Sequence, residues 1–138
     1  MSERPFLFLS VLLAVALLGC SKPTPSIVGK WSGWMTVKCP NGQPPTPNYR
    51  PLTISLDLTA DGQCTNVHGS GIGADITSHD TYVKLDSLLL VTNVWGTDTL
   101  TIASLTETEL VLRRAPYENG CMHSFTMERA SHGEVDPK

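Results

Sequence analysis

Residues 52–67 read LTISLDLTADGQCTNV, and this stretch decides the fold. Apolar and polar residues alternate from Leu52 to Leu58, which is the pattern of a strand with one buried face. Ala60-Asp61-Gly62-Gln63 is rich in turn formers, so the chain is expected to reverse there and continue as a second strand over 64–67. The stretch therefore predicts a β-hairpin.

The same alternation recurs on both sides of this hairpin. Residues 27–38 predict a first strand, with Trp31, Met35 and Val37 on its buried face and Trp34 on its wetter face. The prolines that follow, from Pro40 to Pro51, exclude a central strand over that segment. Further strands are predicted over 82–85, 88–91, 99–105, 109–113 and 122–129, with connections at 86–87, 93–98, 106–108 and 116–120.

The sequence thus predicts an all-β protein. About seven or eight short strands joined by tight turns, without helical crossovers, favour antiparallel neighbours, and closing the sheet on itself removes exposed edges. The expected architecture is a small antiparallel up-and-down β-barrel. A two-layer β-sandwich remains the alternative, because one sequence separates the two poorly.

The N-terminal segment predicts export. Residues 5–19 are almost entirely apolar and follow Arg4, which is the pattern of a secretory signal. The run of roughly fifteen residues is shorter than the ~20 needed to span a membrane. Leu17-Leu18-Gly19-Cys20 resembles the lipobox of bacterial lipoproteins, which implies cleavage before Cys20 and a diacylglycerol on its sulfur. An ordinary signal with a chance cysteine is the alternative.

Four parts of the chain follow from this interpretation. Residues 1–19 are the signal peptide, 20–26 the lipidated cysteine and a polar tether, 27–130 the barrel domain and 131–138 a flexible tail. Acyl chains hold such a domain at a membrane surface. Ser21, in place of Asp, resembles lipoproteins sorted to the outer membrane, so the expected location is the cell envelope, facing the periplasm.

Charge and cysteine content narrow the possibilities further. With 10 Lys and Arg against 13 Asp and Glu, the net charge of −3 argues against nucleic acid or an anionic membrane surface as a partner. Beyond Cys20 the cysteines are Cys39, Cys64 and Cys121. Outside the cytoplasm disulfides persist, and an odd number leaves three possible single bridges.

Three short motifs resemble the lipocalins and the small lipocalin-like bacterial lipoproteins. They are Gly29-Lys30-Trp31 at the first strand, Leu58-Thr59-Ala60-Asp61-Gly62 at the hairpin, and the segment LTETELVL at 105–112. The resemblance implies that Trp31 packs across the closed end of the barrel beneath Arg129 of the last strand. An ordinary core tryptophan and a solvated arginine are the alternative.

The barrel closure implied by this resemblance also selects a disulfide. If the first and last strands pair antiparallel, Cys39 at the end of one lies near Cys121 at the start of the other, and Cys64 is left as a free thiol. The chain departs from typical lipocalins in its short length, its lack of a flanking helix and its glycine-rich stretch at 69–73. These departures argue against a large inherited ligand cavity.

The candidate chemical groups do not combine into an active site. His68, His79 and His123 with Asp75 or Asp80 lack the spacing of metal ligands on one element, so separate histidines are expected. The glycines at 69–73 precede no helix start that would bind phosphate, and no serine sits in a Gly-x-Ser-x-Gly motif. The acidic residues lie on polar faces or in turns. The sequence therefore predicts no catalytic residue, no metal, no cofactor and no enzyme.

Binding is the remaining expectation. Side chains that point inward either line a cavity or fill the barrel, and a barrel of this small size favours filling. The residues expected to point inward are Met35, Tyr82, Leu100, Ile102, Leu112, Phe125 and Met127. The loop over 40–51, with Tyr49 and Arg50, and the loop with Trp95 suit a protein partner. The expected contacts with a ligand or partner are Met35, Tyr49, Tyr82, Trp95, Phe125 and Met127.

We therefore expect a lipid-anchored binding protein of the cell envelope. It holds a small apolar ligand or presents its loops to another envelope protein. The alternative function is inhibition of a hydrolase or protease that attacks the envelope.

Overall fold

The fold consists of strands joined by turns and loops. The structure is a computed structural model that describes residues 22–69, 74–116 and 119–131, and these contain no helix long and apolar enough to cross a membrane. The predicted signal peptide, Cys20 and residues 132–138 of the predicted tail lie outside these ranges. The strands are β1 (Gly29–Lys38), β2 (Leu52–Leu58), β3 (Gln63–His68), β4 (Ile76–Leu85), β5 (Leu88–Asn93), β6 (Gly96–Leu105), β7 (Glu109–Arg114) and β8 (Met122–Arg129).

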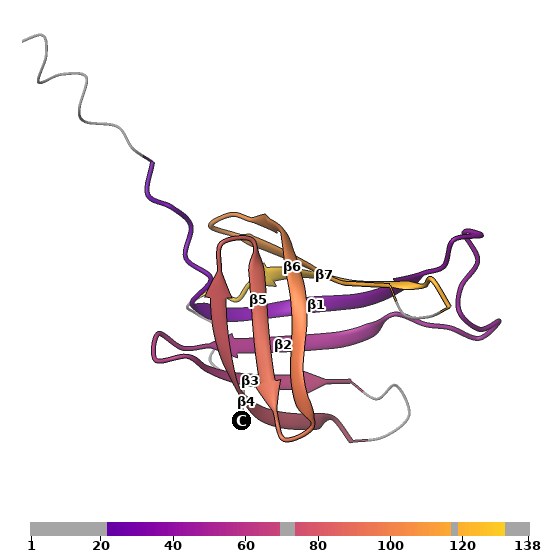
Figure 1. The fold of residues 1–138 in the computed structure, drawn as a ribbon, viewed down its shortest axis with the longest axis horizontal. Helices are drawn as coiled ribbons and strands as arrows, with labels where there is room; N and C mark the ends of the chain where they lie inside the picture. Colours follow the sequence, from indigo (N-terminus) through magenta and orange to yellow (C-terminus); the bar gives the residue numbers. More distant parts are fainter. Residues whose placement is uncertain (1–21, 70–73, 117–118, 132–138) are drawn as a thin grey trace, which may run out of the picture.

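These strands form a closed barrel. Each pairs antiparallel with the next along the chain, and β8 pairs with β1 from Trp31↔Arg129 to Lys38↔Met122 (Figure 1). The predicted up-and-down barrel is confirmed, and the sandwich alternative is wrong, because a sandwich lacks this last pairing.

The topology gives the barrel two different ends. Because neighbouring strands alternate in direction, β1, β3, β5 and β7 end, and the other four strands begin, at the same end of the barrel, which we call the open end. The β2–β3, β4–β5 and β6–β7 turns and the segment before β1 meet at the opposite end, which we call the closed end (Figure 1).

Two strands begin three or more residues earlier than the sequence predicts. The bounds of β2 and β8 match the prediction, but β4 begins at Ile76 instead of residue 82 and β6 at Gly96 instead of residue 99. The start of β4 places polar Ser78 and Asp80 at inward positions, so apolar alternation does not reveal it. The expected loop at 93–98 is a tight turn of Val94 and Trp95, followed by Gly96 at a φ of 137°.

The closed half of the barrel is filled with side chains. Its largest fully buried members lie near this end on five strands, namely Trp31, Leu58, Leu89, Leu110 and Met127. Each such side chain stabilises the fold by ~1.5–3 kcal/mol relative to an exposed one. The closed half is therefore a packed core.

Arg129 closes this end over Trp31. Its guanidinium carbon lies 4.1 Å from the centre of the Trp31 ring, as the lipocalin resemblance implies. The same guanidinium group donates to the backbone carbonyls of Ser26 (2.6 Å), Val28 (2.8 Å) and Glu107 (2.7 Å). It thus joins the segment before β1, the last strand and the β6–β7 turn.

Gly29 makes room for this contact. A Cβ atom there would lie 2.4 Å from Nη1 of Arg129, and the φ of 142° disfavours any other residue. Two residues further on, Trp31 Nε1 donates to the Ile27 carbonyl at 2.8 Å, so the buried indole N–H is satisfied. The Gly-x-Trp motif is therefore explained by the geometry of the closed end.

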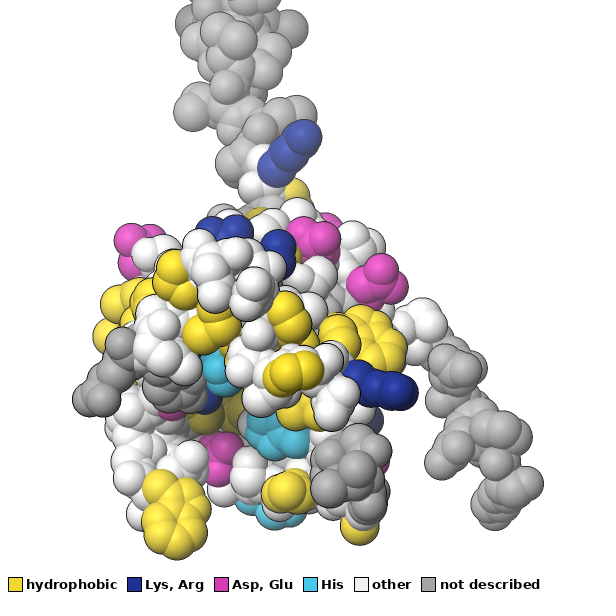
Figure 2. Space-filling model, turned by 90° about the vertical axis from the view of Figure 1, so that its right-hand side faces the viewer, with side chains coloured by type: hydrophobic (Ala, Val, Ile, Leu, Met, Phe, Trp, Pro, Cys, Tyr) yellow, Lys and Arg dark blue, Asp and Glu magenta, His cyan; other side chains and the backbone are white. Residues whose placement is uncertain are grey.

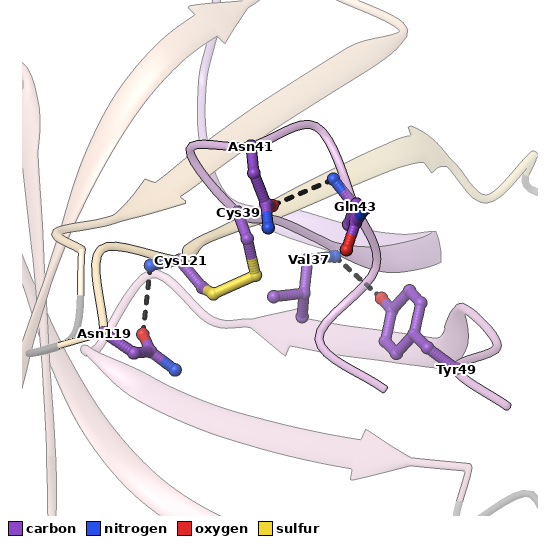
Figure 3. The surroundings of a disulfide bond; sticks show 7 residues. All are labelled: Val37, Cys39, Asn41, Gln43, Tyr49, Asn119 and Cys121. Carbon is purple, nitrogen blue, oxygen red and sulfur yellow. Dashed lines mark hydrogen bonds between the residues drawn. A yellow bond between two sulfur atoms is a disulfide. The ribbon is translucent and has the colours of Figure 1, made fainter. Parts of the chain in front are cut away.

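A disulfide joins the same two strands at the open end. Cys39, which follows β1, is bonded to Cys121, which precedes β8, and Cys64 is free and buried (Figure 3). The predicted bridge is confirmed. The proline-rich loop is also held to β1, because Val37 N–H donates to the Tyr49 hydroxyl oxygen at 2.7 Å.

Removing this disulfide should destabilise the protein without unfolding it. The double variant Cys39→Ser, Cys121→Ser frees a loop with a sequence separation of 82, so the free energy of unfolding should fall by about 4 kcal/mol. Urea titration followed by tryptophan fluorescence measures this change. The control is Cys64→Ala, which leaves the bridge intact: a reductant should lower its free energy of unfolding by the same ~4 kcal/mol and should leave that of the double variant unchanged. A loss below about 1 kcal/mol on removing the bridge would contradict the prediction.

Candidate binding site at the open end

The open half of the barrel encloses a cavity. Its volume is about 150 Å³, so the expectation of a filled interior is correct for the closed half only. Figure 2 looks onto this end and shows a hollow between histidine, acidic and apolar side chains. We call this cavity the cup; it is lined by Ile54, Leu56, Cys64, Asn66, His68, Ser78, Asp80, Val91, Asn93, Asp98, Leu100, Leu112, Arg114 and Phe125.

The lining of the cup is divided between an apolar floor and a polar wall. The floor contains the buried side chains of Ile54, Leu56, Leu100, Leu112 and Phe125. The wall comes mainly from the open ends of β3 and β4, where inward positions carry amide, imidazole, hydroxyl and carboxylate groups. The cup thus combines an apolar surface with a few polar groups, as small-molecule sites commonly do.

Asp80 is the buried carboxylate of the wall. The residue is only 7% exposed, and Ser78 Oγ donates to its Oδ2 at 2.9 Å. The two ion pairs found among the described residues are Lys30–Asp57 and Arg114–Asp98, so neither includes it. Burying a carboxylate without a cation costs free energy.

Asn66 and His68 form the adjacent part of the wall. Asn66 Nδ2 donates to His68 Nε2 at 2.8 Å, so the imidazole proton lies on Nδ1. Burial, and then the positive charge of Arg114, lower the pKa of His68, which is therefore neutral at pH 7. Asn66 Oδ1 is buried and has no hydrogen-bond partner among the described residues.

Arg114 supplies the positive charge of the cup. Its guanidinium is paired with Asp98 of β6, and its carbon lies 5.9 Å from the centre of the Phe125 ring. Burial and this guanidinium also lower the pKa of His123. Asp98 is thus paired with Arg114, and Asp80 is the other acidic residue of the lining.

Cys64 lies at the base of the polar wall as a protonated thiol. Burial, and then the negative charges of Asp80 and Asp57, raise its pKa to about 11. A nucleophilic cysteine requires a thiolate, which this environment opposes. Among the described residues no three His, Cys, Asp or Glu side chains gather in a way that would hold a metal ion.

The residues that the sequence singled out for ligand contact fall in different places. Phe125 lines the cup, whereas Met127 is fully buried in the closed half. Met35 and Tyr82 pack against the core, and the Tyr82 hydroxyl donates to the Thr59 carbonyl in the β2–β3 turn at 2.7 Å. The Tyr49 hydroxyl accepts a hydrogen bond from the Val37 N–H of β1.

Trp95 lies outside the cup, in the turn between β5 and β6. It and Val94 are each 92% exposed. A shallow depression beside the mouth of the cup runs from Trp95 to Asp98 and Arg114. Trp95 is therefore exposed to solvent and does not pack against the barrel.

Sequence reasoning missed most of the polar wall. Ser78, Asp98, Arg114 and Asn66 were not singled out, and His68 and Asp80 were considered only as metal ligands. The sequence does contain a signal for the start of β4, because Ser78, Asp80 and Tyr82 alternate with exposed residues. A search for alternating apolar residues misses it, since Ser78 and Asp80 are polar.

No protein-family model matches this chain, and no curated protein matches its sequence.

The thiol of Cys64 should be unreactive in the folded protein. With a pKa of about 11, about one thiol in a thousand is ionised at pH 8. Alkylation by iodoacetamide, followed by intact mass, should be at least about a hundredfold slower in the native protein than in guanidinium with the disulfide intact. Equal rates in the two conditions would show that the residue is neither buried nor protonated.

Proposed function

We propose that this protein is a lipid-anchored, lipocalin-like binding protein of the cell envelope that holds a small organic molecule in the cup. The observation that carries the proposal is the cavity itself, which opens at one end of a closed barrel whose other end is filled. The Gly29-Lys30-Trp31 motif and the Arg129 contact support the lipocalin-like assignment.

The size of the cup limits its ligand. A cavity of about 150 Å³ is comparable to one that accommodates benzene in another protein. The ligand is therefore small, with about six to ten non-hydrogen atoms, and its apolar part rests on the floor. A long acyl chain does not fit.

The proposed anchor places the mouth of the cup away from the membrane. The tether reaches the barrel through Ser26 and Val28, whose carbonyls are bound by Arg129 at the closed end. The open end lies at the opposite side of the barrel, since β1 runs from one end to the other. A ligand would thus enter from the aqueous phase and not from the bilayer.

The Val94–Trp95 turn favours a second candidate function. Exposed tryptophans are frequent anchors of protein interfaces, and this one stands beside the mouth of the cup. The protein would then present its open end to another envelope protein, which includes inhibition of a hydrolase or protease.

The anchor is tested by lipid labelling in a bacterial host. The protein should incorporate tritiated palmitate and sediment with membranes, and Cys20→Ala should abolish both because it removes the sulfur that carries the diacylglycerol. Cys64→Ala is the matched control and should label normally. Labelling of the Cys20→Ala protein, or none of the wild type, would contradict the proposed anchor.

Ligand binding is tested by filling the cup. Benzyl alcohol should shift the NMR signals of the amides of the lining residues, and Ser78→Phe should remove these shifts because its ring occupies the cavity. Thr77→Phe on the outer face of β4 is the control and should bind as the wild type does. Shifts that persist in the Ser78→Phe protein would place the bound molecule elsewhere.

A further inference from the structure

The cup contains hydrogen-bond acceptors that the described residues leave unmatched. Asp80 is nine-tenths buried and receives one hydrogen bond, from Ser78. Asn66 Oδ1 is buried without a partner among the described residues, and it lines the same cavity. A buried acceptor without a donor costs free energy, so a ligand that donates to Asn66 Oδ1 recovers that cost, and Asp80 on the neighbouring strand can accept from the same ligand.

Two side chains of the same wall donate hydrogen bonds within it. Ser78 Oγ donates to Asp80, and Asn66 Nδ2 donates to His68. The guanidinium of Arg114 is paired with Asp98. An anionic ligand would therefore meet the negative charge of Asp80 without a cation left to neutralise it.

We infer that the cup selects a small organic ammonium ion, with the charged nitrogen at Asp80 and Asn66 Oδ1 and an apolar body on the floor formed by Leu56, Leu100 and Phe125. This inference rests on the proposed binding function and names the ligand class for it. An ammonium group matches the wall in charge and in hydrogen bonding, because it carries donors and no acceptor. The attraction between a cation and a carboxylate is stronger in a buried site than at the surface, because the effective dielectric constant is lower there.

The surroundings favour an organic cation over an inorganic one. A hard metal ion takes six or more oxygen ligands, whereas the described residues offer no group of three His, Cys, Asp or Glu side chains that would hold a metal. The floor beside Asp80 is apolar, so the part of the ligand that rests on it must be apolar as well. A ring or short alkyl chain that carries one ammonium group meets both requirements.

Three probes of one shape test the inference. Benzylamine is cationic at pH 7, benzyl alcohol is neutral and benzoate is anionic, and calorimetry on the purified full chain measures the affinity of each. We expect benzylamine to bind at least tenfold more tightly than benzyl alcohol, and benzoate to bind most weakly. These comparisons use the wild-type protein, so they do not depend on whether a variant folds.

Two matched variants then locate the charge. Asp80→Asn should abolish the tenfold preference for benzylamine while benzyl alcohol binds as before. Asp57→Asn removes one carboxylate from the outer face, where it pairs with Lys30, and should leave the preference unchanged.

The failures of the two proposals are distinguishable. Equal affinities for all three probes, or a preference for benzoate, would overturn the ammonium inference and leave the cup as a binding site. A preference for benzylamine that survives Asp80→Asn would also overturn it. Failure of every probe to bind would refute the proposed binding function itself.

Discussion

The pairing of β1 with β8 is the constraint on which the rest of the structure depends. It joins the two ends of the folded chain and converts a meander into a barrel with an inside and an outside. The pairing is secured at both ends. Arg129 donates hydrogen bonds to the Ser26 and Val28 carbonyls at the closed end, and a disulfide joins Cys39 to Cys121 at the open end. Without this pairing the polar wall and the apolar floor would not face one another.

The closed barrel has one packed half and one half that encloses a cavity. Trp31, Leu58 and Met127 fill the closed half, where large side chains leave no space for a ligand. The open half contains shorter and polar side chains, so it keeps a cavity and a buried carboxylate at Asp80. The apolar packing of the closed half offsets the free-energy cost of the polar groups buried in the open half.

The strands that were predicted correctly are those whose buried face is apolar. Leu52 to Leu58 alternates regularly, so its bounds and its hairpin follow from the sequence alone, and closure of the sheet correctly indicated the disulfide. The start of β4 was missed because Ser78 and Asp80 face inward. Whether the barrel is filled depends on the sizes of inward side chains from seven strands at once, which no local pattern records. The site was therefore harder to predict than the fold.

The most direct test of the closed barrel is an NMR measurement of nuclear Overhauser effects between β1 and β8 in isotope-labelled protein. The structure predicts cross-strand contacts at Ser32/Glu128, Trp34/Thr126 and Thr36/Ser124. The contradictory result is a β1 strand that contacts β2 alone and a β8 strand that contacts β7 alone. Such a sheet would be open, and the cup with its buried Asp80 would not exist.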